Sequence, residues 1–306
     1  MNTSRILATF LCASTATLAA CQPRQADPEA PPLVVATTTM LADLVTQVGG
    51  PVVQSRSIIV AGSDPHLYQP LPADAALVSS SAMVVRNGLH LEGWIDDLVQ
   101  NAGGERPVVT ASDGTDVLTH DGAPDPHFWF DADAWLVAVD GVTNALKTLV
   151  PNDAETIEQR AADYREQVRS LDEWIETQIG TIPPAQRVLV TSHDAFAWFG
   201  RAYGLEVHAV QGVSTQQEAS QRDVLNAVEL VRTRSISAVF GETSVNNSLI
   251  EQVGRQAGVP VLGPLYSDSL GPADGPAATW MTMMSWNVCT IVDGLGGQCS
   301  PFVAAP

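Results

Sequence analysis

The stretch NDAETIEQRAADYREQVRSLDEWIETQIG, residues 152–180, decides how the rest of the chain is organised. It carries many charges and no strand pattern, and its apolar residues recur at steps of three and four, which is typical of an amphipathic helix. Pro151 precedes the stretch, and Gly180 with the prolines after it closes it. We therefore expect one long linking helix within residues 151–181. Its predicted buried face consists of Ile157, Ala161, Tyr164, Val168, Leu171 and Ile175.

On both sides of this helix, short β-branched runs alternate with helical patterns. This alternation predicts an α/β fold in which each of two lobes has a mainly parallel sheet flanked by helices. The lobes are expected over residues 33–150 and 182–306, joined by the long helix, and each is expected to have a core of its own. The predicted strands are 33–37, 57–60, 82–86, 187–191, 206–210, 237–240 and 259–262, and helices are also expected at 40–48 and 91–100.

The N-terminal residues predict export and attachment to a membrane. Arg5 precedes an apolar run that stops at Cys21, which is typical of a lipoprotein signal peptide over residues 1–20. The run is too short and too polar for a transmembrane helix. Residues 21–32 are rich in proline and polar side chains, and we expect them to form the lipidated cysteine and a flexible tether. The mature protein should face the periplasm or the cell exterior.

Charge and cysteine content narrow the possible partners and the compartment. The formal net charge is −19, with 34 acidic against 15 basic residues, which argues against nucleic-acid binding because phosphates would be repelled. Cys12 leaves with the signal peptide and Cys21 would carry the lipid. Cys289 and Cys299 remain in an oxidising compartment, and we predict a disulfide between them, with two free thiols as the alternative.

One tripeptide, Asp-Pro-His, occurs twice, at residues 64–66 and 125–127. Proline fixes its own φ and pushes the preceding residue towards an extended conformation, so each imidazole is presented from a stiffened loop. His66 and His127 are therefore candidate ligands rather than ordinary surface histidines.

Two further candidates follow predicted strands of the second lobe, where open α/β sheets bind ligands. His193 comes after the strand 187–191, and Asp268 lies beyond the strand 259–262, where on its own it would be interpreted as a helix cap. With Asp268 as the fourth ligand, three imidazoles and one carboxylate would make a closed four-coordinate site, which is typical of tightly held zinc. A closed site of this kind binds a metal and does not catalyse a reaction.

The chain resembles the metal-binding lipoproteins of zinc and manganese ABC importers, the cluster A-I solute-binding proteins, over nearly all of its mature length. The motifs that carry the resemblance are SDPHLYQP (63–70), NGL and LEGW (87–89 and 91–94), DPHFWFD (125–131), SHDAF (192–196), YGL (203–205) and QGVST (211–215). The resemblance implies that His66, His127, His193 and Asp268 ligate the metal. It also implies a rigid backbone helix and an ABC-type permease in the cytoplasmic membrane as the partner.

The choice between zinc and manganese depends on one ligand. Manganese-selective relatives commonly have a glutamate at the position of His193, and imidazole nitrogen suits zinc better than manganese, so zinc is favoured and manganese is the alternative. Zinc-specific relatives can carry a long histidine-rich loop near His120, and this chain has almost none of it.

Other functions stay open at this point. A secreted zinc hydrolase would need a general base, for which Glu242 at the end of a strand is the candidate; we interpret Glu242 instead as a carboxylate that supports a ligand. Trp129 is expected to wall off the site, and His90 and His208 to have structural or exposed roles. An adhesin function has no identifiable host ligand. We expect a monomer without enzymatic activity.

Overall fold

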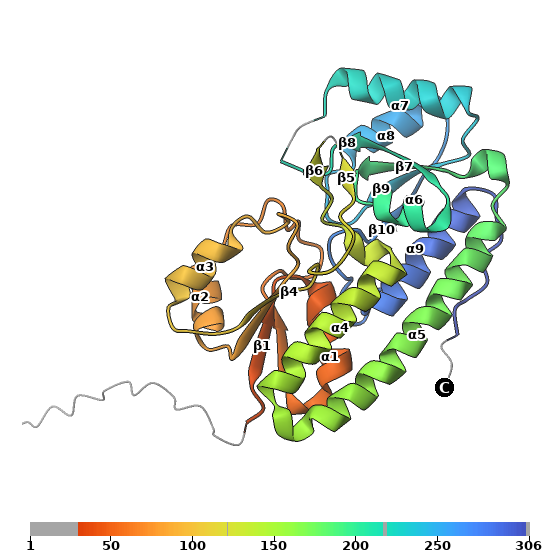
Figure 1. The fold of residues 1–306 in the computed structure, drawn as a ribbon. Coiled ribbons are helices and arrows are strands. Elements are labelled where there is room, and N and C mark those ends of the chain that lie inside the picture. Colours follow the sequence, from red (N-terminus) through yellow and green to blue (C-terminus); the bar gives the residue numbers. More distant parts are fainter. Residues whose placement is uncertain (1–29, 121, 217–218, 304–306) are drawn as a thin grey trace, which may run out of the picture. The chain divides into compact units, whose positions relative to one another are not determined.

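Figure 1 shows the computed structural model, which describes residues 30–120, 122–216 and 219–303. The predicted signal peptide, Cys21 and most of the predicted tether lie outside these residues. Within the part of the chain that the structure describes, no helix is both long enough and apolar enough to cross a membrane.

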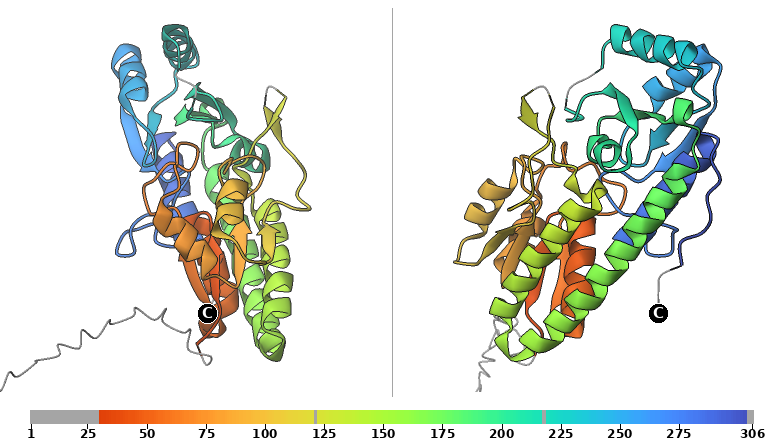
Figure 2. Two further views of the ribbon diagram at one scale, coloured as in Figure 1. Left: turned by 90° about the vertical axis from the view of Figure 1, so that its left-hand side faces the viewer. Right: turned by 45° about the vertical axis from the view of Figure 1, so that its right-hand side comes forward.

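The predicted long helix is confirmed as α5, Ala154–Gly180. All of its predicted apolar positions are buried. Figure 1 and Figure 2 show α5 running along both halves of residues 31–306. On the N-terminal side it packs against α1 (Thr39–Gly49) and α4 (Ala132–Leu149), and on the C-terminal side against α6 (Ala197–Tyr203) and α9 (Trp280–Gly294). A helix with one apolar face thus joins the two halves.

Each half contains a four-stranded parallel sheet, as the alternation of patterns predicts. The N-terminal sheet has the order β2-β1-β3-β4, with β1 at Leu33–Ala36, β2 at Gln54–Ser57, β3 at Met83–Arg86 and β4 at Val108–Thr110. The C-terminal sheet has the order β10-β9-β7-β8, with β7 at Val188–His193, β8 at Glu206–Gln211, β9 at Val239–Glu242 and β10 at Val261–Leu265.

The remaining elements flank the sheets or connect them. The other helices are α2 (Pro72–Ser79), α3 (Ile95–Ala102), α7 (Gln221–Thr233) and α8 (Ser248–Ala257). An antiparallel hairpin joins β5 (Thr119–His120) to β6 (Ala123–Pro124). Single 3-10 turns lie at Gly50–Val52, Phe128–Phe130, Pro151–Asp153 and Pro184–Gln186.

Some predicted boundaries are wrong, for identifiable reasons. The strand predicted at 57–60 lies at Gln54–Ser57, because this edge strand is only partly buried and carries polar side chains. The helix predicted from Leu91 begins at Ile95. The buried Glu92 carboxylate accepts the backbone N–H of Asn87 at 2.7 Å, so the chain turns there before the helix can start.

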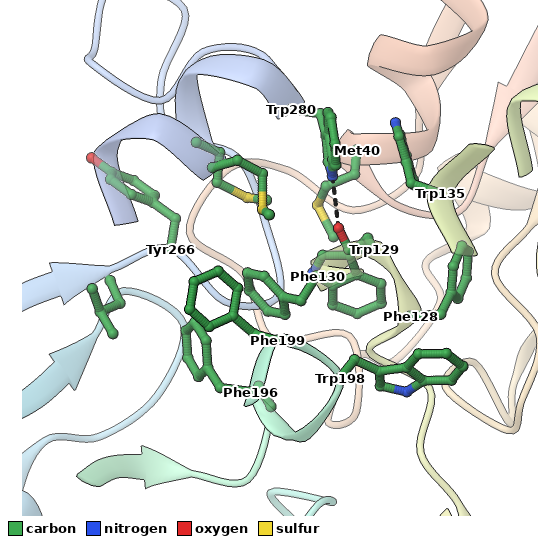
Figure 3. Packing of buried hydrophobic residues seen from close by; sticks show 14 of the residues in the cluster. Met40, Phe128, Trp129, Phe130, Trp135, Phe196, Trp198, Phe199, Tyr266 and Trp280 are labelled. Atoms are coloured by element: carbon green, nitrogen blue, oxygen red, sulfur yellow. Dashed lines mark hydrogen bonds between the residues drawn. The ribbon is translucent and has the colours of Figure 1, made fainter. Parts of the chain in front are cut away.

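The expectation that each lobe has its own core is wrong for the main core. One buried cluster reaches from the N-terminal sheet through α4 and α5 to the C-terminal sheet, and Figure 3 shows its aromatic part. Trp135 stacks on Trp280 with ring centroids 5.0 Å apart, and Phe130 stacks on Phe196 at 4.5 Å. These large side chains fill the space between the lobes. A second, smaller cluster covers the other face of the N-terminal sheet.

A disulfide joins Cys289 in α9 to Cys299. The residues after it lie against α5. Gln178 of α5 accepts the backbone N–H of Ser300 at 2.9 Å, and Trp174 of α5 donates to the Ser300 carbonyl at 3.1 Å. The disulfide therefore holds the end of the chain where it contacts the linking helix.

Candidate metal centre

The four residues that the sequence points to converge in one buried group. One ligand atom from each of His66, His127, His193 and Asp268 lies within 4.8 Å of all the others. His66 is in the loop after β2, His127 directly precedes the turn Phe128–Phe130, His193 is the last residue of β7, and Asp268 follows β10. His127, His193 and Asp268 are fully buried, and His66 is 7% exposed.

The ring of His127 is oriented by a carboxylate within its own tripeptide. Asp125 Oδ1 accepts the backbone N–H of His127 at 3.0 Å and its ring Nδ1–H at 2.7 Å. The first of these bonds closes a turn in which an aspartate binds the backbone two residues further on. Because Nδ1 donates to Asp125, Nε2 is the ring nitrogen that faces the centre of the group, where it can bind a metal once it has lost its own proton.

The ring of His193 is held in the same way by a neighbouring strand. Glu242, at the end of β9, accepts the His193 ring Nδ1–H at 2.6 Å and the His193 backbone N–H at 2.8 Å. Asn247 fixes Glu242 in turn, because it accepts the Glu242 N–H at 2.9 Å and donates to the Glu242 carbonyl at 2.8 Å. Both carboxylate oxygens of Glu242 therefore accept a hydrogen bond from His193.

Asp268 directs both oxygens at the imidazoles. Oδ1 lies 3.5 Å from His127 Nε2, and Oδ2 lies 3.3 Å from His193 Nε2. His66 Nε2 lies 3.3 Å from His127 Nε2. Among the described residues, neither Asp268 oxygen nor His193 Nε2 has a hydrogen-bond partner, although all three atoms are buried. Buried polar atoms that converge without partners fit a bound cation, which they can ligate together.

The electrostatics of the group also favour a cation. Burial lowers the pKa of His66 to about 3, helped by the two other imidazoles. Burial also acts to lower the pKa of His127, but the carboxylates of Asp125 and Asp268 outweigh it and raise that pKa to about 9. For His193, Glu242 and Asp268 overcome burial and raise the pKa well above its usual value. The carboxylates thus stabilise positive charge at this point, whether it is carried by protons or by a metal.

The surroundings separate the site from solvent on one side and leave it accessible on another. The centroids of the Trp129 and His127 rings are 5.2 Å apart, and the Trp129 indole N–H donates to the Ser267 carbonyl at 3.0 Å. Trp129 therefore packs beside the site, as expected for a residue that separates it from solvent. A cavity of about 660 Å³ reaches His66 and is lined on the other side by Gly212 and Gln216. This cavity therefore connects His66 to the surface.

The remaining histidines lie outside the group. His90 is exposed and lines the same cavity, His120 is in β5, and His208 in β8 pairs with Glu206 at 2.8 Å.

Sequence reasoning missed several residues that hold the ligands in place. The sequence marks Asp125 only as part of a motif, although an aspartate two residues before a histidine does predict the observed turn. Asn87 and Thr215 were likewise marked only as parts of motifs: Asn87 donates to the Pro126 carbonyl at 3.0 Å and thereby fixes the loop of His127, and Thr215 binds Asp64 in the His66 loop. Asn247 and Gln216, which binds the His66 carbonyl, gave no signal.

The chain is similar to known metal-binding proteins in sequence and in fold. The family described as zinc-uptake complex component A, periplasmic, matches residues 34–294. The chain is 35% identical over 272 residues to the manganese-binding lipoprotein MntA of Bacillus subtilis, covering 86% of this chain and 89% of that protein. It is also 35% identical over 273 residues to the zinc-binding protein TroA of Treponema pallidum, with the same coverage of 86% and 89%.

Solved structures of metal-binding proteins are similar to this chain in fold as well. The structure of the periplasmic zinc-binding protein TroA from Treponema pallidum superimposes with a TM-score of 0.83 at 34% identity, covering 87% of this chain and 99% of that one. A manganese-bound mutant of the periplasmic metal-binding protein from Candidatus Liberibacter asiaticus gives a TM-score of 0.79 at 25% identity, covering 86% and 99%.

Proposed function

Because the chain belongs to the periplasmic zinc-uptake component A family of metal-binding solute-binding lipoproteins, we propose that it captures zinc between its two lobes and delivers it to an ABC permease. Members of this family are transport components and not enzymes. The observation that carries the proposal is the buried group of three imidazoles and one carboxylate.

The donor set supports zinc as the preferred metal. Nitrogen donors favour zinc over manganese in the usual order of stability, and harder oxygen donors favour manganese. The names of similar proteins do not decide between the metals, because they include a manganese-binding, a zinc-binding and an iron ABC transporter lipoprotein. Asp268 can supply one oxygen or both, which allows four or five bonds to the ion.

We also propose that the chain acts as a lipid-anchored monomer. The similar proteins include manganese-binding and iron-transporter lipoproteins, and a cysteine stands at position 21 directly after the predicted signal peptide. In this proposal Cys21 is acylated, residues 22–32 are the tether, and the lobes are 33–150 and 182–306. A Cys21→Ala variant should lose its membrane association. Processing at the same site and continued membrane attachment of that variant would contradict the anchor.

The identity of the bound metal is tested by elemental analysis and by competition between zinc and manganese. Protein purified without added metal is analysed for its elements, and wild type and His193→Glu are then titrated with zinc and manganese in competition. His193→Glu replaces one nitrogen by an oxygen, so it should narrow the preference for zinc. Tighter binding of manganese than of zinc by the wild type would contradict the proposed preference for zinc but not the proposed capture of a metal. Absence of tight binding for both metals would overturn the proposed function.

A further inference from the structure

The two Asp-Pro-His tripeptides are built alike in sequence but are held differently. In both, the aspartate Oδ1 accepts the backbone N–H of the histidine, at 2.8 Å for Asp64 and 3.0 Å for Asp125. Asp125 also holds the ring of its own histidine, as described above. Asp64 instead uses its second oxygen, Oδ2, to accept the hydroxyl of Thr215 at 2.6 Å.

Thr215 belongs to the other half of the molecule. It follows β8 in the loop 211–216, and its side chain is nearly buried. The next residue, Gln216, donates from its side-chain amide to the backbone carbonyl of His66 at 2.8 Å. Two side chains of the C-terminal half thus bind the segment that presents His66, one through Asp64 and one through the histidine itself. We call Thr215 and Gln216 the latch.

The segment around Asp268 shows the reverse arrangement: it belongs to the C-terminal half and is held by residues of the N-terminal half. Its neighbours Ser267, Ser269 and Leu270 all bind the N-terminal half. Trp129 donates to the Ser267 carbonyl at 3.0 Å, Gly62 N–H donates to Ser269 Oγ at 2.8 Å, and Leu270 N–H donates to Thr39 Oγ1 at 2.7 Å. The bonds that hold the Asp268 segment therefore do not involve residues 212–216.

One latch residue, Gln216, also lines the cavity that reaches His66. Gly212, Val213 and Ser214, which precede the latch, line the same cavity. His127 and His193 are each oriented by a buried carboxylate that accepts the ring Nδ1–H. His66 is the most exposed of the four candidate ligands, and its segment is held by Thr215 and Gln216 of the other half.

We propose that Thr215 and Gln216 are positioning residues that hold His66 in the metal site, and that breaking the latch is the step that opens the site for metal release. This inference rests on the proposed function, because it assumes that His66 ligates the captured metal. It assigns a function to the QGVST motif, residues 211–215, that the resemblance alone does not explain.

The test measures how fast zinc leaves the folded protein. Zinc-loaded protein is mixed with excess chromogenic chelator at several concentrations, and the dissociation rate is extrapolated to zero chelator. Thr215→Val keeps the shape but removes the hydroxyl that binds a carboxylate, so release should accelerate roughly tenfold to a hundredfold, as expected for loss of a hydrogen bond to a charged group. Thr215→Ser keeps the hydroxyl and should release zinc at close to the wild-type rate.

Matched controls separate the latch from general damage. Thr233→Val removes an exposed hydroxyl that binds only its own helix, at the Glu229 and Leu230 carbonyls, and should leave the rate unchanged. Gln216→Ala alters an exposed side chain, so it tests the latch without a buried change, and it should accelerate release by a smaller factor.

Wild-type rates in both Thr215→Val and Gln216→Ala would overturn the latch, as would equal acceleration in Thr215→Ser and Thr215→Val, because the hydroxyl would then be irrelevant. If wild-type protein binds zinc tightly and only the rates fail to change, metal capture stands and the latch alone is wrong. If wild-type protein binds neither zinc nor manganese, both the function and the latch are wrong.

Discussion

Asp125 and Glu242 each bind the far nitrogen of a histidine ring, and this fixes both the tautomer and the direction of the ring. A free imidazole carries its proton on either nitrogen and rotates about χ2. A site built from unsupported histidines would therefore bind metal more weakly, because binding would have to fix both the tautomer and the ring orientation. The carboxylate also makes the imidazole a better donor. Two of the three imidazoles therefore reach the metal already oriented.

Replacing Glu242 should weaken metal binding without removing a ligand. In Glu242→Gln the charge is lost and an amide replaces one of two acceptors, so we expect zinc affinity to fall by about 10- to 100-fold, the usual effect of changing a residue behind a ligand. Competition titration measures this. Glu251→Gln, which changes an exposed glutamate that pairs only loosely with Arg255 at 3.6 Å, is the matched control. Equal affinity in both variants would mean that Glu242 does not support His193.

Metal binding should release protons at neutral pH. The pKa of His127 is raised to about 9 and that of His193 well above its usual value, so both rings are protonated in the metal-free protein at pH 7, whereas the pKa of His66, about 3, leaves that ring neutral. Zinc must displace the protons of His127 and His193. Affinity should therefore fall as pH decreases from about 9, well above the value near 6.5 that an unperturbed histidine would give.

Titration calorimetry at pH 7 in buffers of different ionisation enthalpy measures this release. The observed binding enthalpy should change linearly with the buffer enthalpy. An enthalpy that is the same in every buffer would show that the rings are already neutral.

The candidate ligands could be predicted because their signals are local. The Asp-Pro-His repeat marks His66 and His127, and the ends of strands mark His193 and Asp268. The latch could not be predicted, because Thr215 lies 151 residues from Asp64 along the chain. The local sequence around Thr215 and around Asp64 does not indicate that folding brings the Thr215 hydroxyl to the Asp64 carboxylate.

At the scale of elements, the periodicity of apolar residues predicted which helix positions are buried. It failed to predict where a helix or strand begins or ends when hydrogen bonds set that boundary. The apolar spacing of α5 is intrinsic to the helix, so its six predicted positions are all buried; Gln178 and Ile179 in the last turn are buried as well and were not predicted. The end of β7 is different. The sequence predicts it at Thr191, but pairing with β8 continues to His193 opposite Gln211, so the ligand lies on the strand itself and not in a loop after it. This makes His193 more rigid than a loop residue would be.

The disulfide between Cys289 and Cys299 should stabilise the contact between the end of the chain and α5. Replacing both cysteines by alanine opens a short loop, with a sequence separation of 10, and should lower the free energy of unfolding by about 2–3 kcal/mol. Urea denaturation of protein made in an oxidising compartment measures this change. A variant without these two cysteines that is as stable as the wild type would show that the contacts of Ser300 with α5 suffice without the bridge.

At the scale of the whole molecule, the shared aromatic core should make the two lobes unfold together. Zinc binds only the folded chain, so zinc at one hundred times its dissociation constant should add about 2.7 kcal/mol to the free energy of unfolding. His66→Ala should remain folded, because the core does not include the site, but it should lose this increase.

Chemical denaturation with and without zinc, followed by both fluorescence and circular dichroism, tests these points. Two separate transitions in the metal-free wild type would contradict a shared core. Failure of His66→Ala to fold would mean that the site is part of the structural framework and not a binding site alone.

The order of strands has one more consequence. Numbered within each sheet, the N-terminal strands run second, first, third, fourth, and the C-terminal strands β8, β7, β9 and β10 run in the same order. His127 comes after the fourth strand of one sheet, and Asp268 after the fourth strand of the other. The two halves therefore repeat one topology, and the group of candidate ligands takes residues from both copies of it. A repeat of this kind is what duplication of an ancestral half would produce, and it would place the site where a two-fold dimer of such halves has its interface.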